Sequence, residues 1–190
     1  MKRSTGVFLP LMILASAACL TLPAACNKEE LQTTYNKQET YIESFIANAL
    51  KKDADATVTN TEGVYRLTQH DTLNKPDSLL WGGRVTLRYA CYVLSSSSVS
   101  SSNLVATNVK SVATAAGWAL TDTSQFHPVT LTLDKTLLEG LRLGLYGVQE
   151  EDEGYILFNG KFGFGDHIQG TIPARSALAY QIWIDSIENQ

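Results

Sequence analysis

Cysteine is scarce in this chain, and the positions of the few cysteines exclude two common classes of small protein. Cys19 and Cys26 lie in or beside an apolar stretch at the N-terminus, which leaves only Cys91 in the rest of the sequence. A single thiol cannot form an internal disulfide, and it supplies too few ligands for a cysteine metal site. Cys91 also falls among alternating apolar residues, so it is interpreted as a small buried side chain rather than a nucleophile.

Basic clusters and the familiar catalytic motifs are also missing. The formal net charge is −4 and no block of Lys or Arg is present, which argues against nucleic acid as a partner. His70, His127 and His167 are far apart in the sequence and lack the spacing of metal ligands. The sequence contains neither a Gly-x-Ser-x-Gly elbow nor a P-loop. The acidic run at residues 150–153 lacks the alternation of a calcium loop and is interpreted as a solvated turn.

The N-terminus has the features of a secretory signal. Lys2 and Arg3 precede an apolar stretch at residues 7–22, which is too short for a comfortable membrane span. Small residues then lead into Cys26, and polar residues follow it. This junction resembles the lipobox of bacterial lipoproteins, in which the cysteine becomes the acylated first residue. The alternative is an ordinary signal peptide that happens to contain a cysteine.

The residues after Cys26 bear on where the chain is delivered. Lys28, Glu29 and Glu30 resemble the surface-export signal of Bacteroidetes lipoproteins. This resemblance implies an outer-membrane lipoprotein of the cell envelope, held by a lipid on Cys26. Whether the chain lies on the periplasmic or the surface-exposed side stays open.

Hydrophobic residues make up 44% of the sequence, which is enough for a folded domain. We expect a lipoprotein signal peptide at residues 1–25, a lipidated cysteine and polar tether at 26–36, an N-terminal helix and linker at 37–62, and one folded domain at 63–190. The helix is predicted from helical spacing of apolar residues, with Asn36 and Glu39 placed as a capping box. Those apolar residues are Tyr41, Ile42, Phe45, Ile46, Ala49 and Leu50.

From residue 63 onward the apolar residues recur with a period of two, which is typical of strands. Strands are predicted at residues 64–68, 84–94, 129–133, 155–158 and 178–184. In the strand predicted at residues 84–94, one face carries Val85, Leu87, Tyr89, Cys91 and Val93. The serine-rich run that follows, at residues 95–102, is interpreted as a flexible loop.

Two helices are predicted between these strands. A short one ends at Gly117, and a longer one at residues 135–145 presents a stripe of leucines. Gly140 and Gly144 weaken the longer helix by roughly 1 kcal/mol each relative to alanine, so we interpret them as places where another surface approaches closely. Runs of strands with one amphipathic helix among them predict an α+β domain, in which an antiparallel sheet wraps around that helix.

The C-terminal part of the sequence contains three motifs in order. Leu137-Leu138-Glu139-Gly140 occurs in the predicted helix, Phe162-Gly163-Phe164-Gly165 forms an aromatic loop, and Ile172-Pro173 leads into the last strand. Together they resemble the C-terminal half of FKBP-type peptidyl-prolyl isomerases. Residues 85–89 and Pro128-Val129 are similar to two further segments of that family, so the resemblance covers most of residues 63–187. A helix ahead of such a domain is similar to lipoprotein members from Bacteroidetes.

This resemblance implies an FKBP-like fold with a shallow apolar pocket that receives proline. Carried over position by position, it implies that the pocket is formed by Tyr89, Val129, Leu137, Phe164, Ile172 and Tyr180. It also implies that the partners are proline-containing segments of exported proteins and, through the lipid, a membrane. No cofactor or metal is implied, and the oligomeric state is left open.

Several positions depart from the family pattern. The pocket floor, usually Trp, is Leu137, and the loop tyrosine that offers its hydroxyl to the substrate is Phe164. The acidic residue of the family falls near residues 106–108, where no acid is present. A replacement from elsewhere, such as Trp118 or Asp122, would favour catalysis if it entered the pocket. Two functions therefore stay open: a peptidyl-prolyl isomerase, or a non-catalytic FKBP-like protein that binds peptides or acts as a chaperone.

Overall fold

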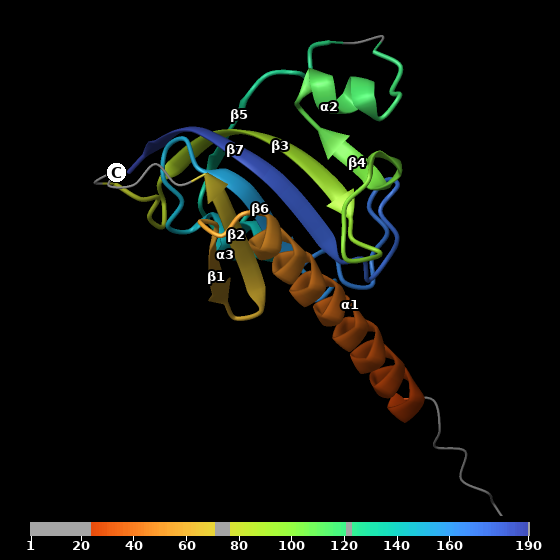
Figure 1. Ribbon diagram of the computed structural model, residues 1–190. Helices are drawn as coiled ribbons and strands as arrows, with labels where there is room; N and C mark the ends of the chain where they lie inside the picture. The colour runs from red at the N-terminus through yellow and green to blue at the C-terminus, as the bar shows by residue number, and fades with distance from the viewer. Residues whose placement is uncertain (1–23, 71–76, 121–122, 190) are drawn as a thin grey trace, which may run out of the picture.

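A computed structural model describes residues 24–70, 77–120 and 123–189. Its seven strands form one antiparallel sheet in the order β1-β2-β6-β7-β3-β4, with β5 pairing with a second stretch of the β3 edge. The helices are α1 (Ala24–Lys52), α2 (Lys110–Ala115) and α3 (Glu139–Leu145), and a 3-10 turn, η1, covers Ser101–Asn103. The strands are β1 (Thr57–Thr61), β2 (Val64–His70), β3 (Arg84–Val93), β4 (Leu104–Thr107), β5 (Val129–Thr132), β6 (Glu153–Phe158) and β7 (Leu178–Glu188). Figure 1 shows the sheet curving around α3, which confirms the predicted α+β class.

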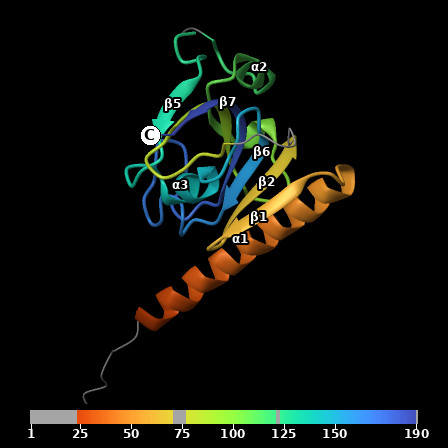
Figure 2. The same ribbon diagram turned by 90° about the vertical axis from the view of Figure 1, so that its left-hand side faces the viewer.

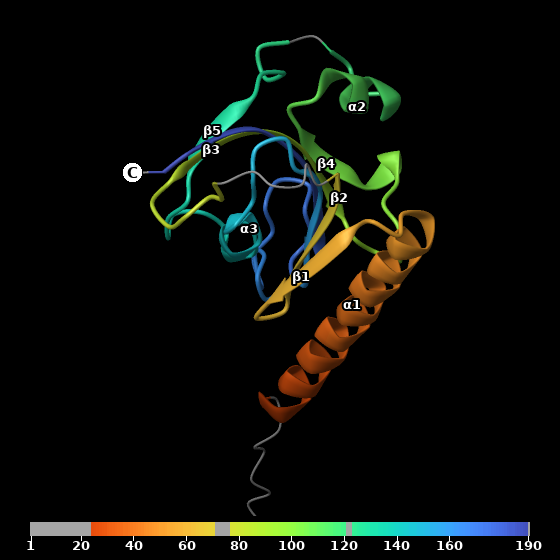
Figure 3. The same cartoon turned by 60° about the vertical axis from the view of Figure 1, so that its left-hand side comes forward.

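The two faces of the sheet pack against different helices because side chains alternate along each strand. In β3, Leu87 and Cys91 belong to the apolar cluster that contains α3, whereas Ala90 and Tyr92 belong to the cluster that contains α1. Figures 2 and 3 show α3 inside the curve of the sheet and α1 on its outer side. The alternation predicted for residues 84–94 is therefore confirmed.

Close packing of α3 on the sheet explains the two glycines in that helix. A Cβ atom at Gly144 would lie 2.2 Å from Cγ2 of Ile156, and one at Gly140 would lie 2.4 Å from the ring of Phe158. Both distances are shorter than any real contact of a methyl group, so α3 reaches β6 only because these two side chains are absent. The predicted close approach is confirmed.

The first helix is longer than predicted. α1 runs without a break from Ala24 to Lys52, so the stretch predicted as a polar tether at residues 26–36 is helical. No proline or glycine interrupts it, and its Lys, Glu and Gln residues favour helix. Asn36 does not cap a helix start, since its side-chain oxygen accepts a hydrogen bond from Nε2 of Gln32 at 2.7 Å within the helix. No helix in the described part of the chain has the length and apolarity needed to cross a bilayer.

The predicted linker at residues 53–62 contains a strand. β1 pairs with β2 through a two-residue turn at Glu62 and Gly63, whose φ angles are +57° and +96°. Such a turn fits the right-handed twist of a hairpin, and β-branched residues in β1 favour the extended chain. The side-chain oxygen of Asn60 accepts a hydrogen bond from the backbone N–H of Gly63 at 3.0 Å, which holds the turn.

Two further predictions need correction. The helix predicted at residues 135–145 begins only at Glu139, because the Asp134 carboxylate accepts hydrogen bonds from the backbone and hydroxyl of Thr136 and makes a turn there. The acidic run was predicted to be solvated, but Asp152 is only 6% exposed. Its carboxylate accepts a hydrogen bond from the N–H of Gln149 at 2.8 Å. It also lies near the guanidinium of Arg66, where its charge opposes the lowering of the Arg66 pKa by burial.

Candidate functional site

An apolar cavity of about 280 Å³ opens on the α3 side of the sheet. Aliphatic side chains from β3, β5 and α3 form most of its wall, and they are Leu87, Val129, Leu131, Leu137, Leu141 and Leu145. Ala106 of β4 and the rings of Tyr89 and Tyr180 complete it. We refer to this space as the proline-sized cavity, after the ring that the family resemblance implies as its ligand; its lining contains no charged side chain.

The cavity contains four of the six site residues predicted from the sequence. Tyr89, Val129, Leu137 and Tyr180 all line it, although they come from four separate elements or turns. Phe164 and Ile172 do not line it, but both pack against the apolar cluster from which the cavity is formed. Ile172 is 8% exposed, so it acts as a core residue in this structure.

Sequence reasoning missed several of the lining residues. Leu87 lies two residues before Tyr89 in the same strand, so the period of two already placed both on one face. Leu141 and Leu145 follow Leu137 at intervals of four, which is the spacing of one helical face. Both spacings are visible in the sequence and could have identified these lining residues. Ala106 carries no such signal, because it reaches the cavity only through the pairing of β4 with β3.

The aromatic side of the cavity is a connected group of rings. The ring centroids of Tyr89 and Tyr180 are 6.1 Å apart, and those of Phe158 and Tyr180 are 5.9 Å apart. Tyr180 lies opposite Cys91 in the pairing of β3 with β7, and burial raises the pKa of its hydroxyl. Burial also raises the pKa of the Cys91 thiol, from 9.0 to about 12. Cys91 is therefore a neutral buried thiol at neutral pH and not an activated nucleophile.

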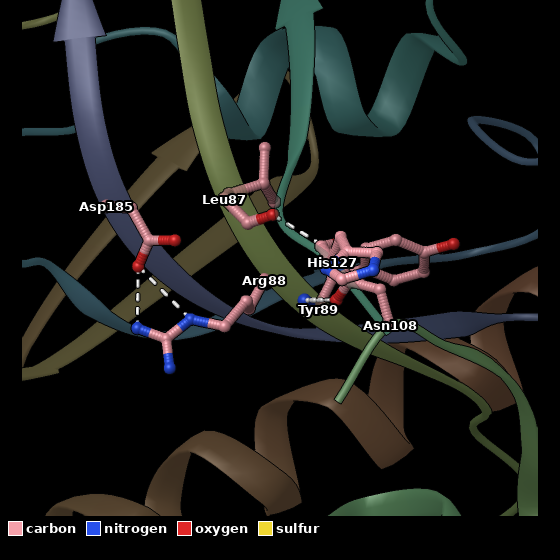
Figure 4. Close-up of polar contacts among 6 residues, drawn as sticks. All are labelled: Leu87, Arg88, Tyr89, Asn108, His127 and Asp185. Carbon is pink, nitrogen blue, oxygen red and sulfur yellow. Dashed lines mark hydrogen bonds and ion pairs between the residues drawn. The ribbon is translucent and has the colours of Figure 1, made fainter. Parts of the chain in front are cut away.

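The side chain of Asn108 holds the β3 backbone at two residues that line the cavity, Leu87 and Tyr89. β3 pairs with β5 up to Leu87 and with β4 from Ala90 onward, which leaves a gap in the ladder between them. The Asn108 amide fills this gap. Its oxygen accepts a hydrogen bond from the N–H of Tyr89 at 2.7 Å, and its nitrogen donates to the carbonyls of Leu87 at 3.2 Å and His127 at 2.9 Å. Figure 4 shows this group, which we call the Asn108 bracket.

The Asn108 bracket joins three segments that the sequence separates. It holds the β3 backbone at Tyr89, the end of β4, and the chain that leads into Val129 of β5. Arg88, which precedes Tyr89 in β3, donates two hydrogen bonds to Asp185 of β7, at 3.1 and 2.6 Å (Figure 4). Its side chain therefore joins β3 to β7 and takes no part in the Asn108 bracket. Asn108 is 4% exposed, and its polar atoms are directed at the backbone.

The polar groups around the cavity are largely engaged by the protein itself. Asn108, near the position of the family's acid, uses its amide on the backbone. The N–H of Leu137 donates to the carbonyl of Asp134 at 3.3 Å, and the N–H of Thr136 donates to the Asp134 carboxylate at 2.8 Å. Trp118 packs in the cluster on the α1 side, and Asp122 lies outside the described residues. The site thus offers apolar walls and aromatic rings rather than an acid–base pair.

A larger hollow of about 570 Å³ lies on the other side of the sheet. It is bounded by the end of α1, including Lys51 and Lys52, and by Ser97 and Ser98 of the serine-rich loop. Its lining mixes polar residues with apolar ones such as Phe45 and Val99, and none of the predicted site residues lines it. Size alone therefore does not select the functional site, and the smaller cavity is distinguished by its apolar walls.

Sequence comparison gives no relative, whereas structure comparison gives many. No protein-family model matches the chain, and no curated protein matches it in sequence. The N-terminal domain of FKBP42 from Arabidopsis thaliana superposes with a TM-score of 0.51 at 14% identity, covering 71% of this chain and 94% of that one. FkpA from Escherichia coli gives 0.53 at 12% identity, covering 86% of this chain and 65% of that one.

A third match is a peptidyl-prolyl cis-trans isomerase from Pseudomonas syringae. Its TM-score is 0.52 at 16% identity, with 83% of this chain and 96% of that chain covered. The three matched proteins differ in source and in length, yet each superposes on the same sheet and helix arrangement. The chain has the fold of the FKBP-type peptidyl-prolyl isomerases.

Proposed function

We propose that this chain is a peptidyl-prolyl cis-trans isomerase, attached to the cell envelope by a lipid on Cys26, that acts on proline-containing segments of exported proteins. The observation that carries the proposal is the proline-sized cavity, lined by Tyr89, Val129, Leu137 and Tyr180, on an FKBP-like fold. A prolyl ring is apolar and compact, and it fits a cavity whose walls are leucine, valine and tyrosine.

The reaction needs no covalent chemistry, which suits the absence of an acid–base pair at this cavity. The barrier is rotation about a partial double bond, about 18–20 kcal/mol. Moving the amide from water to an apolar environment weakens the charge separation that keeps it planar. A surface shaped to the twisted amide then binds the transition state more tightly than either planar isomer.

Separate residues have separate roles in this mechanism. Leu137 and Val129 would hold the prolyl ring from opposite elements, and the rings of Tyr89 and Tyr180 would form the aromatic wall beside it. The Asn108 bracket would hold Tyr89 in position beside the prolyl ring, through the hydrogen bond from the N–H of Tyr89 to the Asn108 oxygen. Restricting these walls before the peptide arrives reduces the entropy lost on binding.

A second candidate is a peptide-holding protein without turnover. The observation that favours it is the engagement of polar groups near the cavity, since Asn108 and the N–H of Leu137 already have partners within the protein. A site that cannot donate a hydrogen bond to the substrate carbonyl would bind proline but stabilise the twisted amide less. Such a protein would delay aggregation of unfolded chains without speeding isomerisation.

The test of catalysis is a proline-limited refolding reaction with the purified full chain in mild detergent. Leu137→Ala and Tyr89→Ala should each lower the acceleration by about tenfold, the equivalent of about 1.4 kcal/mol in transition-state binding. Leu80→Ala is the matched control, because Leu80 is 49% exposed and does not line the cavity. If the folded parent gives only the uncatalysed rate, the isomerase proposal fails and peptide binding becomes the function to test.

The anchor is tested separately from the chemistry. α1 begins near Cys26, and at 1.5 Å per residue it would hold the first buried residue, Ile42, about 24 Å from the cysteine. We expect the native chain to partition into membranes and Cys26→Ser to be released into the soluble fraction. Intact mass should show the added acyl chains on the first but not on the second. Equal partitioning of both, with no acyl mass, would remove the lipid from the proposal.

A further inference from the structure

The segment that joins β6 to β7, residues 159–176, carries two of the predicted site residues, and we call it the site loop. Phe164 and Ile172 lie within it. Its first turn is tight, with the N–H of Phe162 donating to the carbonyl of Asn159 at 3.1 Å and the N–H of Gly165 donating to Gly160 at 3.1 Å. Its end is marked by Arg175, which has a φ of +59°.

Gln38 of α1 contacts both ends of the site loop with one side chain. Its amide oxygen accepts a hydrogen bond from the N–H of Gly160 at 2.9 Å, and its amide nitrogen donates to the carbonyl of Arg175 at 2.6 Å. A Cβ atom at Gly160 would lie 2.5 Å from that same carbonyl, so the two ends are pressed together at this point. Gln38 thus holds the two ends of the site loop together.

Neighbouring residues of α1 strengthen this contact. The Glu39 carboxylate accepts a hydrogen bond from the amide of Asn159 at 3.3 Å, next to the start of the loop. Tyr35 lies one turn earlier, where burial raises the pKa of its hydroxyl, the nearby Asp166 raises it further and Arg175 lowers it. Asp166 and Arg175 form an ion pair within the loop. α1 therefore meets the loop and its start through residues spread over little more than one helical turn, rather than through Gln38 alone.

The site loop is in turn connected to the proline-sized cavity. The carbonyl of Phe162 accepts a hydrogen bond from the N–H of Gly140 at 2.9 Å, which ties the loop to the start of α3. Leu137 and Leu141, on either side of that residue in sequence, line the cavity. A continuous set of contacts therefore runs from α1 through the loop to the cavity wall.

We propose that Gln38 is a positioning residue for the proline-sized cavity, by which α1 holds the site loop and, through it, the α3 wall of the cavity. This inference rests on the function proposed above for its effect on turnover, and it makes the N-terminal helix part of the site rather than a passive spacer. A partner or membrane contact that moved α1 would loosen the loop and so lower the affinity for proline-containing peptides.

The experiment compares Gln38→Ala with Gln32→Ala in the full chain. Gln32 lies in the same helix, but its side chain donates only to Asn36 at an exposed position, so its loss removes the same chemical group without touching the loop. Gln38→Glu is a third variant, because it keeps an acceptor for the N–H of Gly160 and loses the donor to Arg175.

Three readouts separate the inference from the proposed function. Amide hydrogen exchange of residues 160–176 should be about tenfold faster in Gln38→Ala and unchanged in Gln32→Ala, as expected for the loss of two hydrogen bonds. Methyl NMR signals of Leu137 and Leu141 should shift or broaden in the first variant only. KM for a proline-containing peptide should rise several-fold with little change in kcat, and Gln38→Glu should be intermediate in all three.

The outcomes are distinguishable. Faster exchange in the loop with unchanged Leu137 and Leu141 methyl signals would overturn the inference, because the loop would then not reach the cavity. Equal behaviour of Gln38→Ala and Gln32→Ala would overturn it as well. A parent chain that binds no peptide and catalyses no isomerisation would end the proposed function, while the methyl signals would still decide whether α1 shapes the cavity.

Discussion

The two faces of the sheet are built from the same strands, but they pack against different helices, and the hollows left beside these helices differ in character. On the outer face, Ile42, Phe45 and Ile46 of α1 cover the sheet with buried side chains. On the inner face, α3 packs closely against β6 but leaves the proline-sized cavity beside β3 and β5. On the outer face a hollow with a mixed polar and apolar lining remains beside the end of α1, whereas the cavity on the inner face is lined by aliphatic and tyrosine side chains.

The difference comes from the length and composition of the two helices. α1 has 29 residues and crosses the sheet with an apolar stripe, whereas α3 has seven and is drawn toward β6 by its two glycines. A short helix pulled to one side cannot cover the whole concave surface. The cavity is therefore a consequence of helix placement, and the residues that set this placement should matter as much as those that line the cavity.

The largest effect is expected from Asn108→Asp, which would place an acid near the position where the family has one. In this structure the Asn108 nitrogen donates to the carbonyls of Leu87 and His127. A carboxylate has no donor for them and would be buried beside two carbonyl oxygens. We expect a loss of about 4 kcal/mol in the free energy of unfolding at neutral pH, measured by urea denaturation, and no gain in isomerisation.

Asn60→Asp is the matched control for that substitution. Asn60 is exposed and its oxygen, which accepts from the N–H of Gly63, is kept in the acid, so the substitution should be tolerated there with a change below about 0.5 kcal/mol. If Asn108→Asp were equally mild and raised isomerase activity, its side chain would have to point into the cavity. The Asn108 bracket would then be wrong.

A second substitution sharpens the comparison of the two faces. Ile42 has no exposed surface and lies between α1 and the sheet, so Ile42→Ala should lower the free energy of unfolding by about 3 kcal/mol. Leu137 is only partly buried and already borders empty space, so Leu137→Ala should cost about 1 kcal/mol. Urea denaturation of both variants measures the difference. Equal losses would mean that the two faces are packed alike.

A third substitution tests the close approach of α3. Gly144→Ala should destabilise by about 2 kcal/mol despite the better helix propensity of alanine, because the new methyl group would collide with Ile156. Gly163→Ala is the control, since its nearest neighbour would lie at 3.5 Å, an ordinary contact. In an Ile156→Ala background, the additional cost of Gly144→Ala should be smaller, because the side chain that collides with the new methyl group has been removed. An equal additional cost in both backgrounds would place the strain elsewhere.

Much of the fold could be predicted from the sequence because it depends on local alternation. The strand at residues 84–94 and the last strand show a clear period of two, and Gly140 and Gly144 stand out in a leucine-rich helix. The boundaries of α1 could not be predicted. Residues 26–36 are good helix formers, but polar residues of this kind are equally compatible with a tether. Nothing in the sequence shows that Gln38 and Glu39, which follow them, contact a loop more than 100 residues away.

The candidate site was only partly predictable, for a related reason. Tyr89, Val129, Leu137 and Tyr180 were found from the family resemblance, and the structure brings them to one cavity. The role of Asn108 could not be found, because it depends on a gap between β4 and β5 along β3 that exists only in the folded sheet. Phe164 and Ile172 were placed at the pocket by the family resemblance, but neither lines the cavity: Ile172 is buried in the core cluster and the partly buried Phe164 packs against it.

The smallest effect concerns the buried thiol on the inner face. The pKa of Cys91 is raised from 9.0 to about 12 by burial, so the folded state keeps a proton that the unfolded chain releases. This contribution to stability is complete below pH 9 and is lost as the pH rises from 9 toward 12. By pH 10 the loss should amount to roughly 1 kcal/mol. Cys91→Ala should therefore show a shallower fall in unfolding free energy between pH 8 and pH 10 (about the range over which the unfolded thiol ionises) than the parent. Equal slopes in the two proteins would mean that water enters the cavity and reaches the thiol, and the inner face would then be open to solvent in the folded state.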